Sequence, residues 1–257
     1  MSEALVKEKK VLAANFIYLK LKEENIAREA KPGQFVMVKI APGWDPLLRR
    51  PLAILEVDGS NFSLLFQISG RGTRFLASIE VGTKIEVLGP LGNGFSLPEE
   101  NKPVLLLAGG RGMVPLTFLA RKLVNRQIPV IFFLGVKRQE EIFLTSFLDF
   151  VPSLVVACQE RSKTFFCGTV IETFSQWLSV HSLPSGSRVY ACGPDNMLRA
   201  LNQLPQLEKI LVEVSLEARM GCGFGACLSC AVKRKDQLGY YHVCKDGPVF
   251  AREKIAW

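Results

Sequence analysis

Histidine is scarce in this chain, and the side-chain machinery of most hydrolases is missing with it. Only two of the 257 residues are histidines, His181 and His242, and no His-Glu-x-x-His pattern occurs. A Ser/His/Asp or Cys/His site, or a zinc protease, therefore has little support. If the protein is an enzyme, we expect bound cofactors to carry its chemistry.

Long apolar runs are missing as well. No segment reaches the about 18 uninterrupted apolar residues of a membrane-spanning helix, and the opening MSEALVKEKK has no apolar stretch after a basic region. We therefore expect a cytoplasmic protein without a membrane span. In a reducing compartment, clustered cysteines are more often metal ligands or redox groups than disulfide partners.

A concentrated charge of one sign is also lacking. The net charge is +8, but the lysines and arginines are spread along the chain rather than gathered in one stripe. This distribution predicts an ordinary solvated surface and no nucleic-acid partner.

The spacing of apolar residues changes near residue 100 and divides the chain into two parts. Up to about residue 100, short β-rich runs alternate with turn signals, and the Asp58-Gly59 pair marks a hairpin, which predicts a small antiparallel barrel. From about residue 103, short apolar runs alternate with helical patterns, which predicts a parallel sheet covered on both faces. We expect a barrel domain at 1–100, an α/β nucleotide-binding domain at 101–212 and a small domain at 213–257.

Two loops of the predicted sheet suit a nucleotide. The segment LAGGRGMVPL follows a buried strand and opens a helix, where glycines let the backbone approach a pyrophosphate. The segment ACGP ends a later strand and should face the same crevice. The residues concerned are Gly109, Gly110, Gly112, Cys192, Gly193 and Pro194. A tight turn and a small buried cysteine are the alternatives.

Two segments of the predicted barrel suit a phosphate and a flat ring. RRPLAI at 49–54 places two arginines before an extended strand, and GRGT at 70–73 is a turn whose N–H groups could face a phosphate. Solvated arginines and a plain turn are the alternatives.

Four cysteines lie close together near the C-terminus. Cys222, Cys227 and Cys230 form a C-x4-C-x2-C pattern, and Cys244 follows after thirteen residues. This is the spacing of plant-type 2Fe-2S ferredoxins, whereas zinc sites more often present two C-x2-C pairs. Gly223 and Gly225 would let backbone N–H groups turn toward the sulfides. A zinc site and free thiols are the alternatives.

The two remaining cysteines outside these motifs, Cys158 and Cys167, fit no ligand spacing. We expect them to be packing residues.

Taken in order, these motifs resemble the ferredoxin-NADP reductase superfamily. The segments GPLGNGF, EARMGCGFGACLSCAV and VCKDGPVF look like those of the electron transfer subunits of bacterial dihydroorotate dehydrogenase B, and the resemblance covers nearly the whole chain. It implies that FAD is held by Arg50, Pro51, Leu52, Ala53, Leu65, Phe66, Gln67, Gly72 and Thr73. It also implies that NAD is held by the glycine and ACGP loops, and that the four clustered cysteines ligate a 2Fe-2S cluster.

Three positions depart from the pattern of that family. Ala53 stands where a Ser or Thr is usual, Gln67 replaces a usual Arg, and Ala108 replaces the first glycine of a triple-glycine loop. We expect these changes to tune flavin binding rather than abolish it.

The resemblance implies an electron transfer subunit in pyrimidine (UMP) biosynthesis. An FMN-containing dihydroorotate dehydrogenase subunit would be its partner, two copies of each forming a heterotetramer, with NAD+ as the final acceptor. One alternative is an NAD(P)H-dependent diaphorase or ferredoxin reductase subunit serving a hydrogenase or a sulfide dehydrogenase. Another is a zinc-bearing interaction or nucleic-acid module. The choice between NAD and NADP stays open, with Arg138 and Arg161 as candidates for a 2'-phosphate contact.

Overall fold

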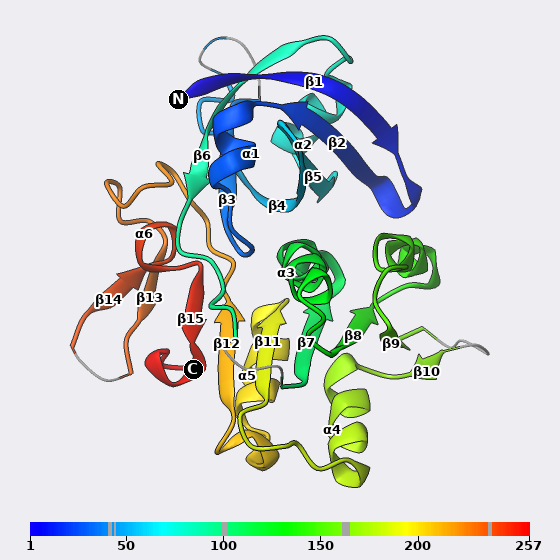
Figure 1. The fold of residues 1–257 in the computed structure, drawn as a ribbon. Helices are drawn as coiled ribbons and strands as arrows, with labels where there is room; N and C mark the ends of the chain where they lie inside the picture. Colours follow the sequence, from blue (N-terminus) through cyan, green and yellow to red (C-terminus); the bar gives the residue numbers. More distant parts are fainter. Residues whose placement is uncertain (41–42, 44, 99–101, 161–164, 236–237) are drawn as a thin grey trace.

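The N-terminal part of the chain forms a closed antiparallel barrel (Figure 1). The computed structural model describes residues 1–40, 43, 45–98, 102–160, 165–235 and 238–257. The barrel strands are β1 (Ser2–Val11), β2 (Phe16–Lys22), β3 (Phe35–Val38), β4 (Arg50–Asp58), β5 (Asn61–Gln67) and β6 (Lys84–Leu91). They close in the order β1-β2-β5-β4-β3-β6. Alternate apolar residues, such as Leu19 and Leu21 of β2, fill the interior.

The predicted hairpin is confirmed, because β4 and β5 are joined at Gly59, where φ is +58°. Short helices fill the other connections: η1 (Ala13–Asn15), α1 (Glu24–Glu29) and α2 (Arg71–Ser78). The prediction that GRGT forms a turn was wrong, because Arg71 begins α2. The Thr73 hydroxyl accepts hydrogen bonds from the N–H groups of Ser69 and Gly70, which satisfies the start of this helix.

The middle of the chain forms the predicted parallel sheet. Its strands are β7 (Val104–Gly109), β8 (Val130–Val136), β9 (Ser153–Cys158), β10 (Phe166–Cys167), β11 (Arg188–Cys192), β12 (Leu211–Ser215) and β15 (Val249–Ala251). They lie in the order β10-β9-β8-β7-β11-β12-β15, and only β15 runs antiparallel. The predicted fold class is therefore confirmed, with one added antiparallel edge strand.

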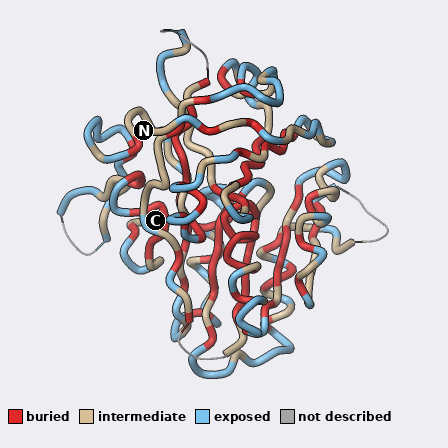
Figure 2. The backbone as a smooth tube through the Cα atoms, turned by 45° about the horizontal axis from the view of Figure 1, so that its top comes forward, coloured by how far each residue is buried: buried red, intermediate tan, exposed pale blue. Residues whose placement is uncertain are grey.

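Helices cover both faces of this sheet. On β7, Leu106 packs in the same cluster as residues of α3 (Met113–Asn125), whereas Leu105 and Leu107 pack with α4 (Val170–Val180) and α5 (Asp195–Asn202). Figure 2 shows the buried backbone running through these central strands. The remaining helical turns are η2 (Gly110–Gly112), η3 (Gln139–Phe147) and η4 (Pro205–Leu207).

The segment EEIFLTSFLDF does not form the predicted α-helix; η3 is a 3-10 helix. The Thr145 hydroxyl donates to the Ile142 carbonyl at 2.8 Å, and the Ser146 hydroxyl donates to the Phe143 carbonyl at 2.7 Å. These bonds to the residue three positions earlier fit the tighter turn.

The C-terminal segment adds a hairpin of β13 (Ala231–Lys233) and β14 (Tyr240–His242), the helix α6 (Val243–Asp246) and the turn η5 (Arg252–Lys254). Its strand β15 pairs with β12, so this segment closes one edge of the large sheet. The expected division at 100/101 falls on residues outside the described ranges, and the three-domain division stays a prediction. None of the helices in the described ranges has the length and apolar character needed to cross a membrane.

The barrel lies over the carboxyl ends of the parallel strands (Figure 1). Arg121 of α3 pairs with Glu56 of β4 at 3.2 Å. The rings of Phe16 and Phe143 meet edge to face with their centroids 5.4 Å apart. The two layers therefore pack directly against each other beside the strand ends.

Candidate functional site

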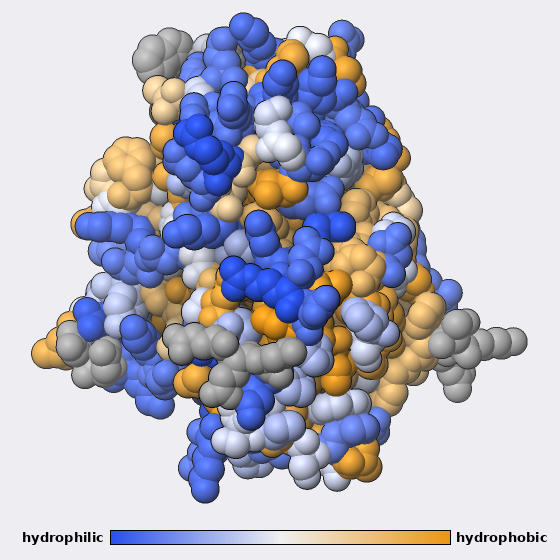
Figure 3. All heavy atoms as spheres, viewed as in Figure 1, coloured by the Kyte–Doolittle hydropathy of each residue, from blue (hydrophilic) through white to orange (hydrophobic). Residues whose placement is uncertain are grey.

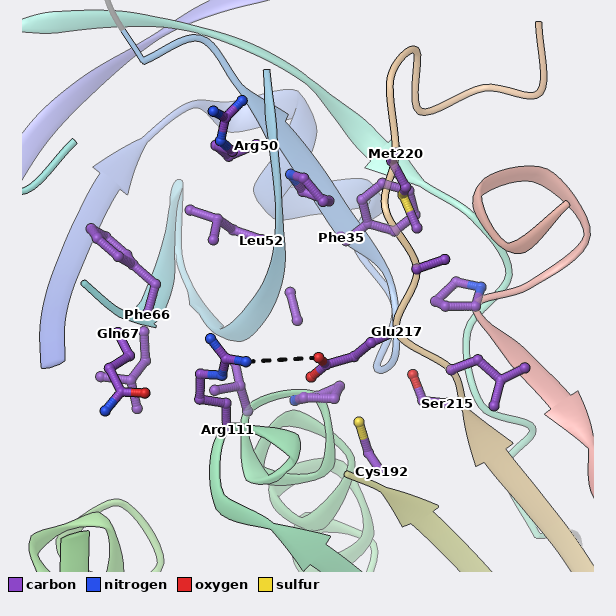
Figure 4. Close-up of a pocket in the computed structure, with 18 of the residues that line it drawn as sticks. Phe35, Arg50, Leu52, Phe66, Gln67, Arg111, Cys192, Ser215, Glu217 and Met220 are labelled. Atoms are coloured by element: carbon purple, nitrogen blue, oxygen red, sulfur yellow. Dashed lines mark ion pairs between the residues drawn. The ribbon is translucent and has the colours of Figure 1, made fainter. Parts of the chain in front are cut away.

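A cavity of about 290 Å³ lies between the barrel and the carboxyl ends of the parallel strands (Figure 4). Its barrel side contains eight of the nine predicted FAD residues: Arg50, Pro51, Leu52, Ala53, Leu65, Phe66, Gln67 and Thr73. Its sheet side includes Cys192 of the ACGP loop. Apolar walls with a few converging charges suit a flat ring that carries phosphates. The described residues therefore fit a flavin nucleotide.

The ninth predicted residue, Gly72, lies directly beneath the Arg50 side chain. A Cβ at Gly72 would stand 2.6 Å from the Arg50 Nε atom and 2.8 Å from the Ile40 side chain. The guanidinium donates to the Leu48 carbonyl at 2.7 Å and borders the cavity. Gly72 thus leaves the space in which Arg50 can face a phosphate.

The three residues that depart from the family pattern, Ala53, Gln67 and Ala108, lie in different surroundings. Ala53 lines the cavity, so the hydroxyl that is usual at this position is absent from the wall. Gln67 lines the cavity too, but its amide donates to the Ala14 carbonyl at 3.0 Å and so holds the turn η1. Ala108 is fully buried within β7 and packs in the sheet core, so the cavity does not include it.

The glycine loop and the ACGP loop pack against each other at neighbouring strand ends. A Cβ at Gly112 would stand 2.1 Å from the Cys192 carbonyl oxygen, and one at Gly109 would stand 2.8 Å from the Pro194 ring. A Cβ at Gly193 would stand 3.1 Å from the Gly109 nitrogen. Gly110, with φ of +51°, has open space at its Cβ position. The open space beside Gly110, next to the start of α3, fits a pyrophosphate.

Cys192 sits at the floor of the cavity as a neutral thiol. Burial, with a smaller contribution from the Glu217 carboxylate, raises the pKa of this thiol to about 12, although a hydrogen bond with Ser215 opposes the shift. Ser215 is its partner on the neighbouring strand β12. Near neutral pH the cavity therefore contains a thiol and a hydroxyl here, rather than a thiolate.

Several cavity residues were not predicted from the sequence. Arg111 and Glu217 face each other across the mouth, with Nη2 and Oε2 3.9 Å apart (Figure 4). The others are Gly33, Phe35, Ser69, Val114, Pro115, Ser215, Leu216, Ala218, Met220 and Pro248. Arg111 lies inside the glycine loop, which could have signalled its role. The wall residues after β12 include Glu217, Ala218 and Met220 of the EARMGCGFGACLSCAV segment, which carries the family resemblance but no local motif for a cavity wall.

The four clustered cysteines are arranged as two pairs. The Cys227 N–H donates to the Cys222 sulfur at 3.4 Å, and the sulfurs of Cys230 and Cys244 lie 3.3 Å apart. In the described part of the chain, no three Cys, His, Asp or Glu side chains converge on a single metal position. Two thiol pairs suit a 2Fe-2S cluster, in which each iron has two protein ligands, better than a single zinc ion.

The local charge environment differs between the two pairs. Burial opposes thiolate formation at Cys222, but the N–H groups of Cys227, Phe224 and Ala226 outweigh it and lower the pKa. The Ser229 hydroxyl and N–H lower the pKa of Cys227 to about 6. Burial and the neighbouring Cys230 thiol raise the pKa of Cys244 to about 12. The loop that precedes Cys227 thus directs donors at sulfur, as expected from its glycines.

The loop between Cys222 and Cys227 contacts the barrel of strands β1–β6. Gly223 has φ of +87°, and a Cβ there would stand 2.5 Å from the Cγ atom of Met37 in β3. Met37 is fully buried, and Phe35, two residues earlier, lines the cavity. The loop between Cys222 and Cys227 is therefore in van der Waals contact with a strand of the cavity wall.

The other residues singled out from the sequence lie apart from these sites. Cys158 is buried, as expected of a packing residue, but Cys167 is exposed, so the packing prediction was wrong for it. Cys167 lies in the two-residue edge strand β10, which has a neighbour on one side only. Arg138 pairs with Glu140 at 2.8 Å on the surface, and Arg161 lies outside the described residues.

Comparison with known proteins gives the family. Residues 217–256 match the family model of the iron-sulfur cluster binding domain of dihydroorotate dehydrogenase B. Over 252 residues, the chain is 37% identical to the dihydroorotate dehydrogenase B (NAD(+)) electron transfer subunit of Desulforamulus reducens, covering 96% of this chain and 95% of that one. The chain belongs to the family of these electron transfer subunits. The Lysinibacillus sphaericus subunit is 36% identical, with 98% and 96% covered.

Solved structures give the same fold for this dihydroorotate dehydrogenase B family member. The NADH-dependent reduced ferredoxin-NADP oxidoreductase superposes with a TM-score of 0.87 at 24% identity, covering 100% of this chain and 91% of that chain. A ferredoxin NADP+ reductase from Neisseria gonorrhoeae, with bound FAD and NADP, superposes with a TM-score of 0.67 at 18% identity, covering 84% and 98%. At these identities the likeness concerns the fold alone.

Proposed function

We propose that this chain carries electrons between an FMN-containing dihydroorotate dehydrogenase subunit and NAD+ in pyrimidine (UMP) biosynthesis. Oxidation of dihydroorotate to orotate on the partner would release two electrons, which this chain would deliver to NAD+ to form NADH. The names of its relatives in Desulforamulus reducens and Lysinibacillus sphaericus support this assignment. A cytoplasmic location and a heterotetramer with two copies of each subunit belong to the same proposal.

One observation carries the proposal: a single short segment serves both sites. Ser215, Glu217 and Met220 line the cavity, and Cys222, two residues after Met220, is the first of the paired cysteines. A group bound in the cavity and a group bound by the cysteines would therefore share one wall. Short separation through packed protein is what electron transfer between two centres needs.

The residues of the cavity have separate roles in this proposal. Bound FAD would exchange a hydride with NAD(H) and single electrons with a 2Fe-2S cluster. Arg50 holds a flavin phosphate, and the apolar walls at Leu52 and Phe35 exclude water from the ring. Gly110 and Arg111, next to the start of α3, hold the anionic part of the pyridine nucleotide.

An apolar hollow next to the cysteines suits the partner subunit. Met1, Leu47, Leu48, Leu88, Phe224 and neighbouring atoms of Arg49, Gly221 and Cys222 line it. Leu47 is 63% exposed and Phe224 is 57% exposed. Figure 3 shows apolar side chains gathered at the left edge of the molecule, between the N-terminus and the β13-β14 hairpin. We place the FMN subunit on this hollow, because electrons leave or enter beside Cys222 and large exposed apolar patches mark interfaces.

A visible spectrum tests the internal relay. Protein reconstituted anaerobically with FAD, iron and sulfide should show flavin and 2Fe-2S absorption, and NADH should bleach both. Absence of either absorption, or one zinc in place of two irons, would overturn the proposal.

Co-purification tests the partner. An FMN protein active on dihydroorotate should be retained by the wild-type chain and by Val180→Asp, which changes an exposed apolar residue on α4, away from the hollow. The Phe224→Asp variant should no longer retain the partner, but NADH should still reduce its flavin and its cluster. Recovery with a hydrogenase, and not with a dihydroorotate dehydrogenase, would favour the diaphorase alternative.

A further inference from the structure

Asn93 joins the flavin barrel to the segment that follows the fourth cysteine. Its side-chain amide donates to the carbonyls of Lys245 and Asp246, both at 3.1 Å, and its backbone N–H donates to the Gly247 carbonyl. Because both side-chain acceptors are carbonyl oxygens, only the amide nitrogen can face them. Asn93 therefore satisfies three consecutive carbonyls directly after Cys244.

The carbonyls of Lys245 and Asp246 need a hydrogen-bond donor from outside their own helix. Lys245 and Asp246 are the last residues of α6, the four-residue helix that contains Cys244. The final carbonyls of a helix have no partner within it. Asn93, which comes from a sequence position 152 residues away from Lys245, supplies that partner.

The loop that carries Asn93 is itself held by the barrel. The Gln34 side chain donates to the Gly92 carbonyl at 2.7 Å, and the Phe95 N–H donates to the Pro32 carbonyl at 2.9 Å. Gly33, between Pro32 and Gln34, lines the flavin cavity. Hydrogen bonds of Gln34 and Phe95 thus hold the loop of Asn93 next to the cavity wall, and hydrogen bonds of Asn93 hold the residues after Cys244.

We propose that Asn93 is a positioning residue that fixes the Cys230–Cys244 pair relative to the flavin cavity. This role rests on the proposed function, in which Cys244 ligates the cluster. Val243 N–H donates to the Cys230 carbonyl at 3.0 Å, and Cys244 N–H donates to the Cys230 sulfur at 3.4 Å, so holding α6 holds both members of the pair. Asn93 touches neither sulfur and acts only through the α6 carbonyls.

Hydrogen exchange in the metal-free protein tests the contact without any cofactor. Asn93→Ala removes the donor, and Asn93→Asp keeps the shape but places acceptor oxygens opposite carbonyls. Because two hydrogen bonds are lost, amides of residues 243–247 should exchange about tenfold faster in both variants. Asn61→Ala is the matched control, since Asn61 also donates to one backbone carbonyl, that of Asp58, within a barrel hairpin. It should leave residues 243–247 unchanged.

Electron paramagnetic resonance of the reduced, reconstituted protein tests the effect on the cluster. Asn93→Ala and Asn93→Asp should shift or broaden the signal and slow cluster reduction about tenfold, while NADH reduces the flavin at the wild-type rate. Asn61→Ala should match the wild type in both measurements.

The outcomes separate this inference from the proposed function. Amide exchange at 243–247 that is identical in both Asn93 variants and the control would overturn the positioning role, and so would an unchanged signal with unchanged cluster reduction. A wild-type chain that binds no 2Fe-2S cluster would instead overturn the proposed function, whatever the exchange data.

Discussion

The sulfur atoms of Cys230 and Cys244 lie 3.3 Å apart, although thirteen residues lie between them in the chain. The hairpin of β13 and β14 returns the chain to this point, and Ala231 pairs with His242 at its base. A loop of this length would otherwise explore many conformations, so the hairpin reduces the entropy lost when the two thiols meet. Cys222 and Cys227 need no such device, because only a tight loop separates them.

Serine substitutions test the two thiol pairs. Cys222→Ser and Cys244→Ser should each abolish the 2Fe-2S absorption, because a hydroxyl is a poor ligand for iron in such a cluster. FAD content should stay at the wild-type level. Cys167→Ser is the control, since Cys167 is exposed and lies in β10. Full iron content in either ligand variant would show that the pairs do not hold the cluster.

Gly223→Ala tests the contact between the cysteine loop and the barrel. The new Cβ would clash with the buried Met37 side chain and occupy a backbone with φ of +87°. Gly82→Ala has nearly the same strain, at φ of +91°, but open space. The control should lose about 1 kcal/mol of unfolding free energy, and Gly223→Ala about 1–3 kcal/mol more. Iron analysis and denaturant unfolding measure both effects, and equal behaviour of the two variants would contradict the contact.

Gly72→Ala should weaken FAD binding about tenfold. The added methyl group would displace the Arg50 guanidinium, and a charge-assisted hydrogen bond to phosphate contributes about 1.5–3 kcal/mol. Gly70→Ala, two residues earlier, meets nothing within 4 Å and should bind FAD as the wild type does. Fluorescence titration of the apoprotein with FAD gives both dissociation constants. Similar dissociation constants for the two variants would show that Arg50 does not bind the FAD phosphate.

Cys192 should resist alkylation well into the alkaline range. Because its pKa is raised to about 12, the folded chain keeps this thiol protonated between pH 9 and pH 12, while the unfolded chain loses the proton from about pH 9. Its contribution to stability is therefore present below pH 9 and is lost as the pH rises toward 12. Mass spectrometry after iodoacetamide treatment at pH 9 should find exposed Cys167 modified and Cys192 intact. Equal labelling would mean that Cys192 is accessible and ionised.

Local patterns in the sequence predict much of the fold. The apolar run at 104–109, the helical spacing after it and the Asp58-Gly59 turn all appear in the structure as expected. Strand β15 was not predicted, because three residues carry little periodicity and gain stability only by pairing with β12, more than thirty residues earlier. Helix α2 was missed because its start depends on the Thr73 hydroxyl, which a turn motif also contains.

The candidate site, like the fold, could be predicted from the sequence only in part. Motifs with fixed spacing, such as the cysteines and the glycine loop, indicate their chemistry directly. Glu217 and Met220 reach the cavity only because β12 delivers the following segment to its wall, and Asn93 reaches α6 only in the folded chain. All three residues stand in the EARMGCGFGACLSCAV and GPLGNGF segments that carry the family resemblance, but no spacing within these segments predicts their contacts.

The pairing of β15 with β12 also constrains how the protein is made. Cys244 and β15 are synthesised after every strand of the barrel and every parallel strand, and so is Pro248, which lines the flavin cavity. The last thiol reaches its partner Cys230 only when the C-terminal segment pairs with β12 at the sheet edge. Neither the flavin cavity nor the set of four thiols is therefore complete until this late segment has been made and has folded.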